Sequence, residues 1–122
     1  MHIHNFWAQL ARTGPEATIN DPGDAGAIPV IRSGVCMLTT ASAETRTLAI
    51  PTHVGQVLML VFTVDVGDCV VTVASGINQT GNTIITFDNA GEYLLLVAAK
   101  VAGLFVWRAI STNPESESPA LS

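Results

Sequence analysis

The hydrophobic positions along this chain fall into short runs with the character of β-strands. Turn-forming glycine, aspartate and asparagine separate the runs, and no apolar stretch keeps a helical period. The runs predict strands at residues 30–32, 36–38, 46–49, 56–64, 69–74, 82–87, 92–99 and 104–110. Short strands at regular spacing indicate an all-β domain, and we expect an antiparallel β-sandwich of jelly-roll-like type.

Several of these runs are apolar on both faces. A strand that buries one face alternates apolar and polar residues, because successive side chains point to opposite sides of the sheet. The run at 56–64 instead has two apolar faces: Val57, Met59 and Val61 on one side, and Leu58, Leu60 and Phe62 on the other. One face can pack into the sandwich core. The other needs a further partner, most simply other copies of the same chain.

Composition divides the chain into three zones. Residues 1–29 are rich in turn formers and predict an extended N-terminal arm, residues 30–113 the β-sandwich domain, and residues 114–122 a flexible acidic tail. The arm carries anchors of the kind that dominate interfaces, and the candidates for partner contact are Phe6, Trp7, Leu10 and Arg12. The alternative for this zone is a disordered terminus with an incidental hydrophobic pair.

Charge and hydropathy exclude several classes of partner. The net charge is −5 and the five basic residues are scattered, so we expect no nucleic-acid binding. The longest apolar stretch, residues 94–107, is interrupted by Lys100 and Gly103 and is shorter than the ~20 residues of a spanning helix, so no membrane association is expected. The start of the chain lacks the pattern of a signal peptide.

Candidate catalytic or metal-binding chemistry is sparse. His2 and His4 share one face of an extended chain, which is half of a metal site, but the pair lies outside any expected strand. His53 follows a proline in a loop and is interpreted as structural. Cys36 and Cys69 lie in apolar runs and are expected to be reduced and buried, with a disulfide as the alternative.

Three aspartates occur at expected turns, where their side chains accept hydrogen bonds from nearby amides: Asp65, Asp68 and Asp88. A calcium site formed by adjacent loops is the alternative for them. No catalytic motif is present, so we expect no enzyme, no cofactor, no metal and no small-molecule substrate.

One sequence pattern in the second half of the chain resembles a known protein family. Gly81-Asn82-Thr83, followed by Phe87, then Ala90-Gly91-Glu92, an aliphatic strand and Trp107-Arg108 resembles the capsid decoration (cement) proteins of tailed bacteriophages, and the similarity spans residues 45–113. The resemblance implies a jelly-roll-like domain that forms a homotrimer on the outer capsid surface of a virion. There it would bridge subunits of the major capsid protein through its arm.

On this view the candidates for the trimer interface are Leu58, Leu60, Phe62 and Arg108. Trp107 is expected in the sandwich core, and Arg108 is expected to form an ion pair between subunits with Glu92 or Glu44.

Two other functions compete with this interpretation. A receptor- or glycan-binding module of a tail fibre, or of another virion appendage, would also be trimeric and rich in β-strands. It should display an aromatic residue in a loop, and the long loop at 76–81 has none. A small jelly-roll enzyme of the cupin type would need a bound metal, and the histidines present do not supply the ligands.

Overall fold

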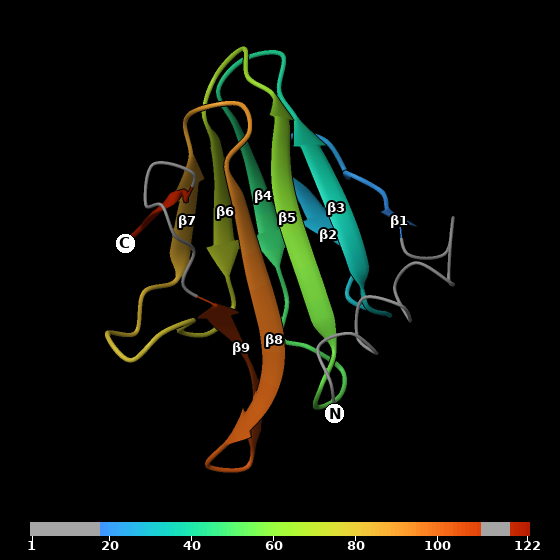
Figure 1. Cartoon of the computed structure of the whole chain (residues 1–122), viewed down its shortest axis with the longest axis vertical. Coiled ribbons are helices and arrows are strands. Elements are labelled where there is room, and N and C mark those ends of the chain that lie inside the picture. Colours follow the sequence, from blue (N-terminus) through green and yellow to red (C-terminus); the bar gives the residue numbers. More distant parts are fainter. Residues whose placement is uncertain (1–17, 111–117) are drawn as a thin grey trace.

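Ten strands and no helix are found in residues 18–110 and 118–122, the part of the chain that the computed structural model describes (Figure 1). The strands are β1 (Thr18–Ile19), β2 (Gly26–Ile28), β3 (Gly34–Thr39), β4 (Glu44–Leu48), β5 (Val57–Val64), β6 (Cys69–Val73), β7 (Ile84–Phe87), β8 (Tyr93–Val101), β9 (Leu104–Ile110) and β10 (Ala120–Leu121). All but one of the predicted strands are present. The exception is residues 30–32, where Ile31 lies in a bend and is 73 % exposed.

The strands form two sheets of five. Sheet A has the order β1-β3-β5-β8-β9, and sheet B the order β10-β7-β6-β4-β2. In Figure 1, β3, β5 and β8 of sheet A lie in front of β4 and β6 of sheet B. One cluster of buried apolar side chains includes residues of both sheets. The chain is therefore an all-β sandwich, as the apolar runs predicted.

The strand pairing is mixed, so the expectation of an antiparallel, jelly-roll-like arrangement is wrong for half of the fold. The first six strands alternate between the sheets, and β1-β3-β5 and β2-β4-β6 are parallel neighbours. The pairs β5-β8, β8-β9, β6-β7 and β7-β10 are antiparallel. Jelly rolls are built from antiparallel Greek keys. Turn residues mark where a strand ends, but they do not reveal that the connections 40–43 and 65–68 cross to the opposite sheet.

The core lies between the sheets and follows from strand alternation. In β5 the side chains of Leu58, Leu60 and Phe62 point inward and are at most 1 % exposed. The ring of Phe62 meets that of Phe87 from sheet B at a centroid distance of 5.8 Å. Trp107 is fully buried, as predicted, and its Nε1 donates to the carbonyl of Ala49 at 2.9 Å.

Both predicted boundaries of the domain are wrong. Within the predicted arm, β1 pairs with β3 and β2 pairs with β4, and Ile19 and Ile28 enter the core. Within the predicted tail, β10 pairs with β7. Each of these strands has only two or three residues, so turn formers dominate the local sequence and the strands escape detection. Residues 1–17 of the predicted arm, 111–113 of the predicted domain and 114–117 of the predicted tail lie outside the described residues.

Candidate assembly surface

The outer face of sheet A is largely aliphatic along the long strands, and its polar side chains are Thr39, Thr63 and Arg108. Side chains that alternate with the core residues meet in register, so that Met59 of β5 is flanked by Val35 of β3 and Leu95 of β8, and Leu95 by Ile110 of β9. We call this surface the aliphatic face, and its members are Val35, Met37, Val57, Met59, Val61, Tyr93, Leu95, Val97, Ala99, Val106 and Ile110. Met37 and Ile110 are almost half exposed, and most of the others are half-buried.

The outer face of sheet B has a different composition. Its side chains are Ala27, Thr45, Thr47, Val70, Thr72, Ile84, Thr86 and Ala120. Four of these eight are threonines, whose hydroxyls can bond water. The two sheets of one chain therefore provide an internal comparison, in which the outer face of sheet B is half threonine and the outer face of sheet A is mostly apolar. A contiguous apolar surface of this kind is typical of an interaction site.

The hairpin of β8 and β9 projects beyond the sandwich (Figure 1). The two strands pair as far as Val101 and Leu104, whereas β8 makes its last backbone bonds to the β5 side at Ala98. The connecting Ala102 and Gly103 both have positive φ, at 51° and 83°, as a two-residue hairpin turn with the favoured twist requires. Residues 99–106 thus form a two-stranded ribbon, and we call them the hairpin tip.

Apolar side chains remain exposed at the hairpin tip. Val101 is 44 % exposed and Leu104 is 68 % exposed. The only charged residue there, Lys100, holds its Nζ 5.4 Å from the centroid of the Phe105 ring. The tip is therefore an apolar projection with a single cation beside it.

The interface candidates derived from the sequence are corrected by this arrangement. Leu58, Leu60 and Phe62 are core residues, so their assignment to the trimer interface is wrong. The two faces of β5 are equally apolar in sequence, and the neighbouring strands decide which of them turns inward. The opposite face, with Met59 and Val61, is the one that is available to a partner.

Arg108 lies at the border of the aliphatic face, next to Val97 in register. Its Nη1 donates to the carbonyls of Gly76 at 2.6 Å and Trp107 at 3.2 Å. Glu92 and Glu44, the expected partners in another subunit, both have partners in their own chain. The four arm candidates Phe6, Trp7, Leu10 and Arg12 lie outside the described residues.

A buried ionic cluster, missed by the sequence interpretation, joins β4 to the connection between β1 and β2. The side chain of Arg46 has no exposed surface, and its Nε and Nη2 donate to the two carboxylate oxygens of Asp21 at 2.7 and 3.0 Å. Its Nη1 is 3.0 Å from Glu44, and its Nη2 also donates to the carbonyl of Thr39. The sequence did hold a signal, because Arg46 shares a strand face with the buried Leu48.

The cluster sets the ionisation of Asp21. Burial of the carboxylate acts to raise its pKa, but hydrogen bonds from Arg46 and from the amides of Thr39 and Gly23 outweigh burial, so the pKa lies below its ordinary value. Asp21 belongs to the connection between β1 and β2. The ion pair therefore fastens the first strands of both sheets to β4 and has a structural role.

The remaining candidates for chemistry have structural surroundings. His53 places its Nδ1 3.0 Å from the hydroxyl of Thr52, and Asp88 accepts from the side chain of Asn89 at 2.9 Å. Cys36 and Cys69 are free thiols with no exposed surface, as predicted, and burial raises the pKa of Cys36 to about 12. Within residues 18–110 and 118–122, no three His, Cys, Asp or Glu residues are grouped so as to hold a metal ion.

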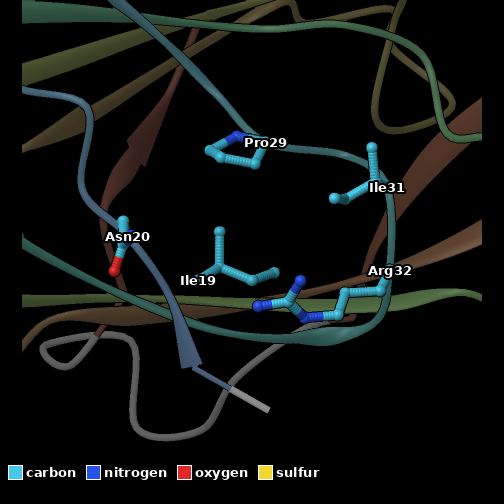
Figure 2. A pocket seen from close by; sticks show the side chains of 5 residues that line it. All are labelled: Ile19, Asn20, Pro29, Ile31 and Arg32. Carbon is cyan, nitrogen blue, oxygen red and sulfur yellow. The ribbon is translucent and has the colours of Figure 1, made fainter. Parts of the chain in front are cut away.

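A small pocket lies beside β1 (Figure 2). It has a volume of about 180 Å³ and is lined by Ile19, Asn20, Pro29, Ile31 and Arg32. Arg32 donates to the carbonyl of Thr18 at 3.1 Å. The lining contains neither a nucleophile nor a carboxylate or histidine that could transfer a proton, so these residues provide no means of catalysis.

No protein family, curated protein or solved structure matches this chain. The resemblance to decoration proteins accordingly stays a prediction. In the described part of the chain, no helix is long and apolar enough to cross a membrane.

Proposed function

We propose that this protein is a non-catalytic structural protein of a virion, a capsid decoration protein that forms a homotrimer and bridges major capsid subunits on the outer shell. The observation that supports the proposal best is the aliphatic face of sheet A, in which Arg108 is the charged neighbour, set against the threonine-rich outer face of sheet B. A soluble sandwich that worked as a monomer would have little use for methionine, leucine and valine on an outer face.

The size of the face sets the scale of the assembly energy. Five strands spaced about 4.8 Å apart and about six residues long give a flat area of about 500 Å². Burial at about 25 cal/mol per Å² gives about 12 kcal/mol for each fully covered face. Association costs about 4–15 kcal/mol, so a partner has to cover most of the face for a stable complex.

The proposed mechanism is thermodynamic. A trimer that binds only the assembled shell stabilises that shell by linkage, because every bound copy adds buried interface to the assembled state alone. The pressure of a packaged genome is then resisted by contacts that bridge neighbouring capsid subunits. No residue has to turn over a substrate.

The first test is the solution mass, measured by light scattering at micromolar concentration. We expect about three times the chain mass of 12.8 kDa. Met59→Lys, which places a charge in the centre of the aliphatic face, should shift the protein to monomer. The matched control Thr72→Lys, on the outer face of sheet B, should leave the trimer intact. A wild-type monomer would refute the assembly.

The second test addresses the partner. Removal of residues 1–15, which contain all four arm candidates, should leave a trimer that no longer co-sediments with empty shells of the cognate major capsid protein. Unimpaired binding by the shortened chain would refute the arm assignment. The two tests are independent, since one reads the self-association of the chain and the other its attachment to the shell.

Glycan binding, the alternative function, finds no supporting observation in the described residues. A sugar-binding site commonly presents an aromatic ring in a loop. The aromatic residues of the described ranges all lie in strands, and they are Phe62, Phe87, Tyr93, Phe105 and Trp107. Of these, Phe62, Phe87 and Trp107 are fully buried.

A further inference from the structure

The connections between strands lie at two opposite ends of the sandwich. Strands with odd numbers run in one direction and strands with even numbers in the other, so successive connections alternate between the ends (Figure 1). The connections at one end are 20–25, 40–43, 65–68 and 88–92. Those at the other end are 29–33, 49–56, 74–83 and 102–103.

The first end holds the acidic residues. All Asp and Glu residues of the described ranges lie in its connections or directly beside them, and they are Asp21, Asp24, Glu44, Asp65, Asp68, Asp88 and Glu92. The one described cation among them is Arg46, which is buried and paired with Asp21 and Glu44. We call this end the acidic end.

The opposite end holds the other described cations. Arg32 belongs to the connection 29–33, and Lys100 comes shortly before the turn at 102–103. Arg108 donates to the carbonyl of Gly76 in a third connection at 2.6 Å. No Asp or Glu of the described ranges lies at this end, which we call the cationic end. The net charge of −5 is thus an average over two ends of opposite sign.

Exposed apolar side chains accompany these cations. Ile31 is 73 % exposed, Val54 is 58 % exposed and Ile50 is 45 % exposed. They belong to the connections 29–33 and 49–56, and none of them is part of the aliphatic face. Apolar side chains surrounded by charges of one sign are typical of a protein interaction surface.

A buried glutamine holds the two connections together. Gln56 is 1 % exposed, and its Nε2 donates to the carbonyl of Val30 at 2.7 Å. Its Oε1 accepts from the amide of Thr52 at 2.9 Å. The backbone of 29–33 is therefore fixed to that of 49–56, so the side chains above it are presented in one arrangement.

The chain outside the structure joins the fold at this end. The described residues begin at Thr18, whose carbonyl accepts from Nη2 of Arg32 at 3.1 Å. Residues 1–17, which contain all four arm candidates, therefore connect to the sandwich next to the cationic end.

We propose that the cationic end docks on an acidic and partly apolar protein surface, and that the acidic end points away from this partner. The inference rests on the proposed function, in which the partner is the major capsid protein of the shell. Arg32 and Lys100 would face carboxylates of the shell, and Ile31 and Val54 would pack on its apolar side chains.

The separation of charge gives this docking its direction. Charges at the rim of an interface act on orientation and association rate more than on affinity, so burial of the apolar side chains has to supply much of the binding. In the reversed orientation, carboxylates would face carboxylates. A protein suits this end better than a membrane, because anionic lipids bind clusters of about 4–8 basic residues, and the cations here are fewer and spaced apart.

Charge reversal at each end tests the orientation. Lys100→Glu should weaken co-sedimentation of the full chain with empty shells of the cognate major capsid protein about tenfold at low salt, and the difference should shrink as salt screens the contact. Asp65→Lys, the opposite reversal at the acidic end, should leave binding unchanged.

A second pair of variants tests the apolar part of the surface. Val54→Glu should weaken shell binding about tenfold, since it places a carboxylate against an acidic partner. The matched control Thr72→Glu adds the same charge to the outer face of sheet B and should bind as the wild type does. Light scattering and the fluorescence of Trp107 establish that each variant stays trimeric and folded.

The outcomes separate this inference from the proposed function. If the wild type binds shells but only Asp65→Lys loses binding, the acidic end docks, which overturns the inference and leaves the proposed function standing. Loss of the trimer in Val54→Glu would place this end between copies and would also overturn the inference alone. A wild type that sediments with phosphatidylserine vesicles and not with shells would overturn both.

Discussion

The buried Arg46 provides a sharp test of how this fold is held together. Asp21→Ala removes both oxygens that accept from Nε and Nη2 of Arg46 at 2.7 and 3.0 Å, while Arg46 keeps no exposed surface. Removing one partner of a buried pair costs about 3–5 kcal/mol, because it leaves a charge without compensation. Glu44 stays at 3.0 Å, so we expect a value near the lower end, about 3 kcal/mol.

Equilibrium unfolding in urea measures this cost. The fluorescence of Trp107, which is fully buried in the native state, reports the transition, and the midpoint and slope give the free energy of unfolding. Asp24→Ala is the matched control in the same connection. Its carboxylate accepts one bond, from the amide of Thr45 at 2.9 Å, and its loss should cost about 1 kcal/mol. If the two variants unfold within 1 kcal/mol of each other, the ion pair does not fasten the first strands as argued.

Three further predictions concern stability. The lowered pKa of Asp21 means that its contribution is complete above the ordinary value of 3.8 and is lost as pH falls through the folded-state pKa, so urea midpoints measured from pH 6 to pH 2 should fall less steeply in Asp21→Asn. Burial raises the pKa of Cys36 from 9.0 to about 12, so the neutral thiol stabilises the fold at neutral pH and this contribution should decline as pH rises from about 9 toward 12. The prediction is contradicted if the free energy of unfolding of Cys36→Ala falls as steeply over this pH range as that of the wild type. A methyl group on Gly67 would overlap the backbone of residues 42–43, so Gly67→Ala should lower the free energy of unfolding by about 3 kcal/mol. Gly55→Ala is the comparison, because only the positive φ opposes the change there and the expected loss is about 1 kcal/mol. Thermal unfolding of both variants checks the difference.

The long strands could be predicted because their signals are local. Leu104–Ile110 coincides with its predicted limits, since the turn at Gly103 defines its start and the β-formers Phe105, Val106 and Trp107 follow. The short strands Thr18–Ile19 and Gly26–Ile28 could not be found in this way. Each has one residue in the core, and only pairing with a distant strand makes it a strand. The same limit hid the parallel pairing, because register between residues far apart in sequence leaves no local trace.

The assembly surface was half predictable. The sequence shows that β5 has two apolar faces, and this correctly indicated an apolar outer surface. It could not show that Leu60 would face inward and Met59 outward, because that choice depends on β3 and β8, which flank β5 in the sheet. Arg46 was overlooked for another reason. A charged residue is usually assigned to the solvent side of a strand, and here a carboxylate from a separate connection meets it inside.

The alternation of the first six strands between the sheets has a consequence for how the protein folds. Each parallel pair, such as β3 with β5, joins residues that are separated by a complete passage through the opposite sheet. Neither sheet can therefore be finished before the other, and most contacts have to wait for the closure of long loops. Proteins dominated by such non-local pairing fold in milliseconds to seconds. During that interval β5 and β8 expose two apolar faces to water instead of one. We therefore expect this chain to need chaperones or low concentration while it folds, and to aggregate readily on rapid dilution from urea.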